Sequence, residues 1–327
     1  MVKIAVVGMG AVGGFLAARL AAAGFDMAAL ARGKTLAALR EHGLRLLAAG
    51  QESSTPIRAS DDARELGPQD LVIVALKGPA LAAAAEGLQW LLGPQTVVMP
   101  AMNGVPWWFL QAGGPGGAAQ RLTSIDADGR IEASIPLARV LGCVVHFTCS
   151  SPQPGVVQHG FGDRLIVGEP AGGTSVRTSA VCAALAKAGF KAEASADIRQ
   201  DIWFKLWGNM TMNPVSALTG ATTDHILDDP LVHGFILRAM EEAALIGARI
   251  GCPITQSGEE RMAVTRQLGG FKTSMLQDAQ AGRALELDAL VSAVHEIGKR
   301  FNVDMPNIGA LLGLTRLMAR ERGLYPR

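Results

Sequence analysis

A strand, a glycine-rich turn, a helix and a second strand follow one another at the start of the chain, and no other feature constrains the fold as much. Residues 2–7 form a continuous apolar, β-branched run, which is typical of a strand buried on both faces. The sequence Gly-Met-Gly-Ala-Val-Gly follows at 8–13, then an alanine- and leucine-rich stretch at 12–23 and a second apolar run at 27–31. A G-x-G-x-x-G motif in this order of elements predicts a unit that binds a dinucleotide.

Each glycine of this motif has a physical role in a Rossmann-type unit. Gly8 allows the tight turn, Gly10 lets backbone N–H groups approach a pyrophosphate, and Gly13 lets the helix pack against the strand. The helix N-terminus then directs the positive end of its dipole at the phosphates. A glycine-rich turn without a ligand is the weaker alternative. The residues that we expect to bind the cofactor here are Gly8, Met9, Gly10, Ala11, Val12 and Gly13.

The residue that ends the second strand predicts which dinucleotide binds. An NAD site usually carries Asp or Glu there to accept hydrogen bonds from the ribose hydroxyls. This chain has Arg32, with Lys34 close by. A guanidinium cannot accept from a hydroxyl but suits a 2′-phosphate, so NADP is preferred over NAD. The alternative is a surface arginine at a strand end.

Composition and charge exclude several classes of protein. The chain has 327 residues, 49% of them hydrophobic and 18% charged, which indicates a well-buried globular protein of two domains. The 30 basic and 29 acidic side chains nearly balance, so we expect no nucleic-acid partner. The four cysteines and six histidines have no metal-ligand spacing, and we expect no metal. No apolar run is long enough to span a membrane, and we expect a cytoplasmic protein.

The pattern of elements changes near residue 195. Further strand-like runs occur at 44–47, 71–76, 96–99, 140–147, 156–157, 164–167 and 190–194, whereas only helical patterns follow residue 197. We therefore expect an α/β Rossmann-type dinucleotide-binding domain at 1–195 and an all-α domain at 196–327, the layout of a two-domain dehydrogenase. The alternative is a helical domain that serves only dimerisation. Residues 113–119 are rich in glycine and predict a flexible loop.

Lys77 and Asn103 follow the ends of two predicted strands. Ligands of an open parallel sheet bind beyond the carboxyl ends of its strands, so both residues are candidates for the cofactor or substrate site. A solvated lysine and an ordinary Asn-Gly turn are equally good interpretations from position alone.

The stretch 203–214 carries a second group of candidates. On a helix, Trp203, Leu206, Trp207 and Met210 form one apolar stripe, and Lys205, Asn209 and Asn213 form a polar stripe beside it. Pro214 predicts that the helix stops just after Asn213. From spacing alone, an ordinary amphipathic helix with a solvated edge is the simpler interpretation.

Two polar residues near the C-terminus also have ordinary structural interpretations. Ser274 begins the sequence Ser-Met-Leu-Gln, which fits a capping box, and therefore predicts a helix N-cap. Glu286 falls in the first turn of another predicted helix, where the dipole favours an acid. A break at Gly282 would separate the two helices.

Taken together, these motifs resemble the ketopantoate reductase family (2-dehydropantoate 2-reductase) over essentially the whole chain. The resemblance rests on the glycine motif with Arg32, V-A-L-K ending at Lys77, N-G at Asn103, P-G-V-V at 154–157, W-x-K-L-x-x-N-x-x-x-N-P at 203–214, S-M-L-Q-D at 274–278 and G-R-x-L-E-x-D at 282–288. A glycine-rich and polar stretch of about twenty residues after Phe109 departs from the shortest members.

The resemblance implies NADPH-dependent reduction of 2-dehydropantoate to pantoate, on the route to pantothenate and coenzyme A. It implies that Lys205 is the general acid, that Glu286 orients Lys205 and binds the substrate hydroxyl, and that Ser274 holds the carboxylate. Asn209 and Asn213 would complete the polar wall. Lys77 and Asn103 would lie near nicotinamide and substrate.

The same resemblance implies a homodimer. A related 2-oxo acid as substrate, or an NADP-binding protein without catalysis, are the alternatives.

Overall fold

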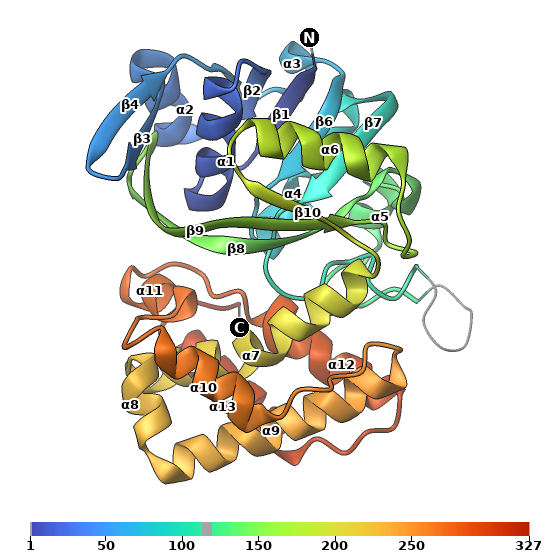
Figure 1. The fold of residues 1–327 in the computed structure, drawn as a ribbon, viewed down its shortest axis with the longest axis vertical. Helices are drawn as coiled ribbons and strands as arrows, with labels where there is room; N and C mark the ends of the chain where they lie inside the picture. The colour runs from blue at the N-terminus through green and yellow to red at the C-terminus, as the bar shows by residue number, and fades with distance from the viewer. Residues whose placement is uncertain (1, 113–119, 327) are drawn as a thin grey trace. The chain divides into compact units, whose positions relative to one another are not determined.

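The computed structural model describes residues 2–112 and 120–326, and the chain forms two compact units (Figure 1). The first unit consists of Met1–Met102 and Asp128–Asp201, and the second of Asn103–Ala127 and Ile202–Arg327. The expected division at 195/196 differs from this arrangement in one main respect. The stretch 103–127 leaves the α/β unit and packs with the helical one.

The first unit contains an all-parallel sheet with the strand order β5-β2-β1-β6-β7. This is the order of one half of a doubly wound dinucleotide-binding fold. Its strands read as continuous apolar runs because both faces are covered; Ile4 and Ile73, for example, are fully buried. The strands are β1 (Lys3–Val7), β2 (Asp26–Leu30), β5 (Arg58–Ser60), β6 (Gln69–Val74) and β7 (Leu92–Pro100). The helices between them are α1 (Ala11–Ala22), α2 (Gly33–His42), α3 (Ala63–Leu66) and α4 (Gly78–Leu88), followed by a 3-10 turn at Gln89–Leu91.

A second sheet of mixed direction completes the first unit. Its order is β10-β9-β3-β4, and β8 pairs with β9 in antiparallel direction. The strands are β3 (Leu44–Ala48), β4 (Gln51–Thr55), β8 (Gly142–Gln153), β9 (Val156–Gly168) and β10 (Lys191–Ser195). The expectation of an open parallel sheet therefore describes only the first sheet. The two short runs predicted at 156–157 and 164–167 belong to the single strand β9.

Helix α1 packs between the two sheets, and its two adjacent glycines make this possible (Figure 1). A Cβ on Gly13 would lie 2.0 Å from the carbonyl oxygen of Gly8, on the side of the first sheet. A Cβ on Gly14 would lie 2.4 Å from Cγ2 of Val157, on β9 of the second sheet. Both distances are far below van der Waals contact, so either side chain would push the helix away from one of the sheets.

The remaining elements of the first unit connect and cover the sheets. They are α5 (Arg130–Ser134), a 3-10 turn at Leu137–Arg139, and α6 (Val176–Lys187). Helix α6 contacts β9, β10 and α1. Its N-terminus is capped by Ser175, whose hydroxyl accepts from the backbone N–H of Thr178, as an N-cap serine does.

The second unit is helical among the residues described. It contains α7 (Ile198–Thr219), α8 (Thr223–Asp228), α9 (Pro230–Arg249), α10 (Gly258–Gln267), α11 (Ser274–Gln280), a π-helical turn at Asp288–Ser292, α12 (Ala293–Arg300) and α13 (Pro306–Glu321). The predicted apolar stripe of α7 is confirmed, because Trp203, Leu206, Trp207 and Met210 are all at most 2% exposed. The indole N–H groups of Trp203 and Trp207 donate to backbone carbonyls of α9.

Helix α7 does not end at Asn213, so that prediction was wrong. It continues through Pro214 to Thr219. Proline removes one backbone donor and is costly inside a helix. Burial outweighs this cost here, because Val215 and Ala217 beyond the proline are 5% and 1% exposed.

The stretch 103–127 is held in the second unit by both apolar and polar contacts. Trp107, Trp108 and Phe109 are at most 1% exposed, as expected of packing residues. The carboxylate of Glu296 on α12 accepts hydrogen bonds from the backbone N–H groups of Thr123 and Ser124 and from the Thr123 hydroxyl. The glycine-rich loop expected at 113–119 lies outside the described residues.

The described residues offer neither a membrane-spanning helix nor a metal cluster. No described helix has the length and apolar character needed to cross a membrane. Among the same residues, no cluster of three or more His, Cys, Asp or Glu side chains could hold a metal ion.

Candidate active site

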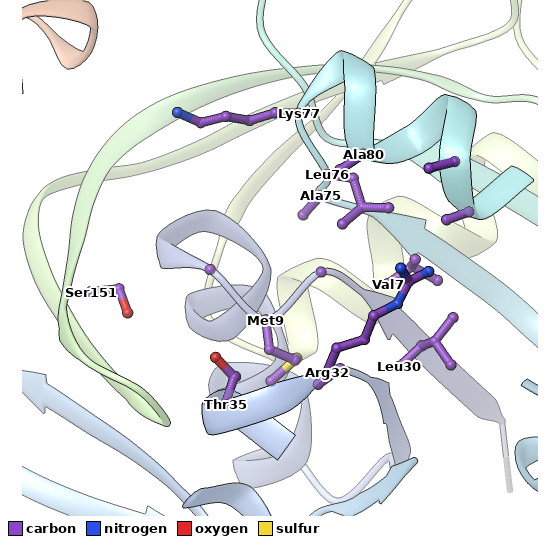
Figure 2. A pocket seen from close by; sticks show the side chains of 15 residues that line it. Val7, Met9, Leu30, Arg32, Thr35, Ala75, Leu76, Lys77, Ala80 and Ser151 are labelled. Atoms are coloured by element: carbon purple, nitrogen blue, oxygen red, sulfur yellow. The ribbon is translucent and has the colours of Figure 1, made fainter. Parts of the chain in front are cut away.

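A cavity of about 450 Å³ lies at the carboxyl ends of β1, β2 and β6 in the first unit (Figure 2). Its volume falls in the usual range for small-molecule and cofactor sites. The residues that line it are Val7, Gly8, Met9, Gly10, Leu30, Ala31, Arg32, Thr35, Ala75, Leu76, Lys77, Ala80, Ala83, Ala84 and Ser151. Five of the cofactor-binding residues predicted from the sequence are therefore part of one cavity: Gly8, Met9, Gly10, Arg32 and Lys77.

The glycine turn of this cavity has the geometry that a phosphate cradle needs. Gly8 has a φ of +94°, and a Cβ there would lie 2.7 Å from the carbonyl oxygen of Ala75 after β6. Gly10 is the N-cap of α1 and leaves open space where a Cβ would stand. Backbone N–H groups at the start of α1 can therefore face an anion. Ala11, Val12 and Gly13 form the first turn of that helix and do not line the cavity.

The charge of the cavity favours a phosphorylated ligand. Arg32 and Lys77 supply positive charge, and no Asp or Glu is among the described residues that line the cavity. Arg32 is also the N-cap of α2, whose first N–H groups receive no side-chain cap. Figure 2 shows Arg32 and Lys77 on different sides of the cavity. The residues fit a dinucleotide with one phosphate group near α1 and another near α2.

Two polar residues that line the cavity, Thr35 and Ser151, were not predicted from the sequence. Thr35 lies in the first turn of α2, three residues after Arg32, and this spacing could have indicated it. Ser151 comes from the end of β8, and nothing local in the sequence connects this hairpin with the glycine turn.

In the second unit, the structure brings two of the predicted residues into direct contact. The Nζ atom of Lys205 on α7 donates a hydrogen bond to Oδ1 of Asn103 across 2.7 Å. Lys205 is half-buried, at the border of the apolar stripe of α7. A lysine ammonium carries three N–H donors and can therefore serve more than one acceptor at a time.

The backbone around Asn103 is fixed against the π-helical turn. The N–H of Val105 donates to the carbonyl oxygen of Ala289 across 2.8 Å. Gly104 has a φ of +85°, and a Cβ there would lie 2.5 Å from the same carbonyl oxygen. Position 104, directly after Asn103, therefore accepts only glycine, because any Cβ there would collide with Ala289.

Asn209 and Asn213 lie one and two turns beyond Lys205 on α7. Asn209 is half-buried and Asn213 is 7% exposed. They continue the polar stripe as the spacing predicts, although Asn213 lies inside the helix and not at its end.

Ser274 and Glu286 both lie near helix starts, but neither has the helix position that the sequence predicted. Thr273 is the N-cap of α11, because its hydroxyl accepts from the N–H of Leu276; Ser274 is the first helical residue and is exposed. The prediction that Ser274 is the N-cap was therefore wrong. Glu286 lies two residues before the π-helical turn at Asp288–Ser292, and not in the first turn of a helix as predicted; it is half-buried between Leu285 and Leu287. Helix α11 ends at Gln280 before Gly282, so the expected break is present.

Comparison with known proteins gives a consistent result over both units. Residues 4–172 match the family described as "Ketopantoate reductase PanE/ApbA", and residues 197–319 match "Ketopantoate reductase PanE/ApbA C terminal". The chain belongs to the ketopantoate reductase family. The predicted family and the fold class, an α/β dinucleotide-binding domain followed by a helical domain, are thereby confirmed. Ketopantoate reductases are NAD(P)-dependent oxidoreductases, and this chain is one of them.

Individual relatives in the ketopantoate reductase family cover nearly the whole chain. It is 43% identical over 324 residues to the 2-dehydropantoate 2-reductase of Mesorhizobium japonicum, covering 99% of each chain. A crystal structure from Ralstonia solanacearum MolK2, provisionally named ketopantoate reductase, has a TM-score of 0.96 and 59% identity, covering 99% of each chain. The fold is shared more widely: D-mandelate dehydrogenase with NADH and anilino(oxo)acetate has a TM-score of 0.85 at 20% identity, covering 98% of this chain and 99% of that one.

Proposed function

We propose that this ketopantoate reductase family member reduces 2-dehydropantoate to pantoate with NADPH, and that Lys205 is the general acid. The observation that carries the proposal is the hydrogen bond between Lys205 Nζ and Asn103 Oδ1. It holds an ammonium group beside the apolar stripe of α7, in a unit whose other predicted residues can bind a small polar acid. The 43% identical relative from Mesorhizobium japonicum supports 2-dehydropantoate as the substrate.

The chemistry requires a proton donor at the substrate carbonyl. A bound reduced nicotinamide would supply hydride to the carbonyl carbon, and negative charge would then develop on the carbonyl oxygen. Lys205 donates a proton to that oxygen and becomes a neutral amine, which is later reprotonated from solvent. Asn103 accepts from another N–H of the same ammonium and so limits its rotation.

The remaining predicted residues have binding and orienting roles in this proposal. Glu286 orients Lys205 and accepts from the substrate hydroxyl, Ser274 donates to the carboxylate, and Asn209 and Asn213 line the polar wall. Support for Glu286 comes from its place three residues before Ala289, whose carbonyl accepts from the segment that carries Asn103.

NADPH is proposed over NADH because of Arg32 and the absence of a carboxylate among the described lining residues. A guanidinium and the open N-terminus of α2 both favour the 2′-phosphate. In the first unit, Gly8, Met9 and Gly10 with the α1 N-terminus bind the pyrophosphate, and Lys77 binds near the nicotinamide end. We also propose that two copies of the chain form a homodimer, which light scattering of the purified protein would test.

The test is a panel of 2-oxo acids assayed with NADPH and with NADH. We expect the highest kcat/KM for 2-dehydropantoate with NADPH. A clear preference for a different branched 2-oxo acid would keep the reaction and replace the substrate. Absence of turnover with every oxo acid, while NADPH still binds, would contradict the enzymatic proposal and favour an NADP-binding protein without catalysis.

A further inference from the structure

The segment 285–288, which carries Glu286, is held by hydrogen bonds from residues that have no role in the proposed chemistry. The motif G-R-x-L-E-x-D at 282–288 contains Arg283 and Asp288 as well as Glu286. Arg283 donates through Nε to the carboxylate of Asp278 across 2.8 Å, and its backbone N–H donates to the carbonyl oxygen of Asp278. These two bonds hold the N-terminal side of the segment against α11.

The C-terminal side is held by the residues that follow α13. The N–H of Leu285 donates to the carbonyl oxygen of Leu324 across 3.0 Å, and the hydroxyl of Tyr325 donates to Oδ1 of Asp288 across 2.5 Å. Leu285 and Leu324 are both 4% exposed. Glu286 therefore lies between two residues, 285 and 288, that are both bonded to the stretch 324–325.

Asp288 is the first residue of a π-helical turn, and this turn is hydrogen-bonded to the segment that carries Asn103, the partner of Lys205. A π-helix is rare, appears mostly as a single turn, and is frequently found at functional sites. Ala289, the second residue of the turn, accepts the N–H of Val105, two residues after Asn103. A displacement of Asp288 would thus also displace Ala289, the next residue, and with it the hydrogen bond to the segment that carries Asn103.

The phenol of Tyr325 is protonated under ordinary conditions, as a donor must be. Burial raises its pKa to about 12, and the hydrogen bond and negative charge of Asp288 act in the same direction. The hydroxyl of Ser292 and the guanidinium of Arg320 lower the pKa but do not outweigh these effects. Arg320 lies over the Tyr325 ring at 5.8 Å and donates to the carbonyl oxygen of Pro326, which holds the ring in place.

We propose that Tyr325 and Asp288 are positioning residues that fix the carboxylate of Glu286 for its action on Lys205 and substrate. The inference rests on the proposed function, since it assigns Glu286 to the reaction. Neither residue touches the reacting atoms; they act through the backbone of the segment 285–288. Catalysis by well-placed groups is sensitive to such support, because a displacement of about 1 Å can cost about a hundredfold in rate.

The test uses Tyr325→Phe, which removes only the hydroxyl, and Thr315→Val as a matched control. Thr315 is fully buried on α13, and its hydroxyl donates to the carbonyl oxygen of Leu311 on the same helix. We expect Y325F to lower kcat about tenfold with the KM for the oxo acid and the affinity for NADPH changed less than about twofold. T315V should keep kcat. A kcat unchanged in Y325F, or lowered equally in T315V, would overturn the proposal.

Substitutions at Asp288 test the same contact from its other side. Asn retains an acceptor for the phenol and Ala does not, so kcat should fall further in Asp288→Ala than in Asp288→Asn. The double variant Y325F/D288A should be no slower than D288A alone, because both changes remove one interaction. Additive losses would mean that the two residues act separately and would contradict the proposal.

Two readouts are independent of turnover and separate this inference from the proposed function. Tyr325 is the one tyrosine of the chain, so its ionisation can be followed directly by ultraviolet absorbance. We expect little tyrosinate at about pH 10.5, where an ordinary tyrosine is largely ionised. Hydrogen exchange at the amides of 285–289 should be faster in Y325F than in wild type or T315V. If wild type reduces no oxo acid but both readouts are as expected, the proposed function fails and the support of the 285–288 segment by Tyr325 and Asp288 is retained. Ordinary ionisation of Tyr325, or unchanged hydrogen exchange in Y325F, would refute that support.

Discussion

The ammonium of Lys205 is bonded to the side chain of Asn103, although the two residues are 102 positions apart in the chain. The stretch 103–127 makes this possible, because it leaves the α/β unit and packs with the helical one. The proposed proton donor and its hydrogen-bond partner thus belong to one compact unit. We therefore expect that dinucleotide binding and proton donation can be altered separately by substitution.

Replacement of Lys205 by Ala should remove the proton donor and leave the dinucleotide site intact. We expect kcat to fall at least about a hundredfold, the usual contribution of a general acid, with NADPH affinity nearly unchanged. Steady-state rates and the fluorescence of bound NADPH measure the two effects. Lys299→Ala, an exposed lysine on α12, is the matched control. Turnover that survives in Lys205→Ala would remove this residue from its proposed role.

Replacement of Arg32 by Ala should weaken the binding of NADPH more than that of NADH. The lost contact is with the 2′-phosphate, which only NADPH carries, so the KM for NADPH should rise about tenfold or more. Arg40→Ala, on the same helix α2, is the control. An equal rise in KM for both cofactors would show that Arg32 does not select between them.

Gly10→Ala and Gly13→Ala should have different consequences although both lie in the same motif. A Cβ on Gly10 meets nothing within 4 Å, whereas one on Gly13 would lie 2.0 Å from the Gly8 carbonyl oxygen. Gly10→Ala should therefore keep the thermal stability of wild type and lose affinity for NADPH. Gly13→Ala should lose both. Thermal unfolding and a binding titration of each variant decide this, and a strongly destabilised Gly10→Ala would contradict the assignment.

The carboxylate of Glu296 should stabilise the fold at neutral pH and lose this effect in acid. Burial alone would raise its pKa, but the hydrogen bonds from Ser124 and Thr123 outweigh burial and hold the pKa below its ordinary value. Its stabilisation is therefore fully present above the ordinary pKa of a glutamate and is lost as the pH falls through the lower folded-state pKa.

Glu296→Gln tests this contribution. We expect it to lower the free energy of unfolding by about 1–3 kcal/mol at neutral pH. The difference from wild type should shrink below about pH 4, because wild type then also carries an uncharged side chain. Denaturant titrations at both pH values measure it, with the exposed Glu321→Gln as control. A difference that does not change with pH would mean that the charge of Glu296 is not involved.

Local patterns in the sequence predicted most of the elements that form the dinucleotide cavity. The run 2–7 and the glycines that follow it are contiguous, so periodicity and backbone geometry suffice to place them. The second sheet could not be inferred in this way. Strand β3 pairs with β9, more than a hundred residues later, and β9 also contacts α1 at Gly14 through Val157.

The sequence was enough to propose candidate residues in the helical unit, but it did not predict their contacts. The stripe of Lys205 and Asn209 follows from helical spacing, whereas the position of Asn103 depends on hydrogen bonds between distant segments. Pro214 predicted a helix end because local sequence rules do not take burial into account. The helix continues to Thr219, since residues on both sides of the proline are buried. Tyr325 has no sequence motif at all, and only the fold brings it to Asp288.

The assignment of residues 103–127 to the helical unit has a practical consequence for the design of expression fragments. A fragment that ends near residue 195 carries Trp107, Trp108 and Phe109 without the helices that bury them, and such a patch favours aggregation. The complementary fragment from 196 onward lacks the Thr123 and Ser124 amides that satisfy Glu296. Independent expression of the helical half requires residues 103–127 to be joined to it in a new order along the chain.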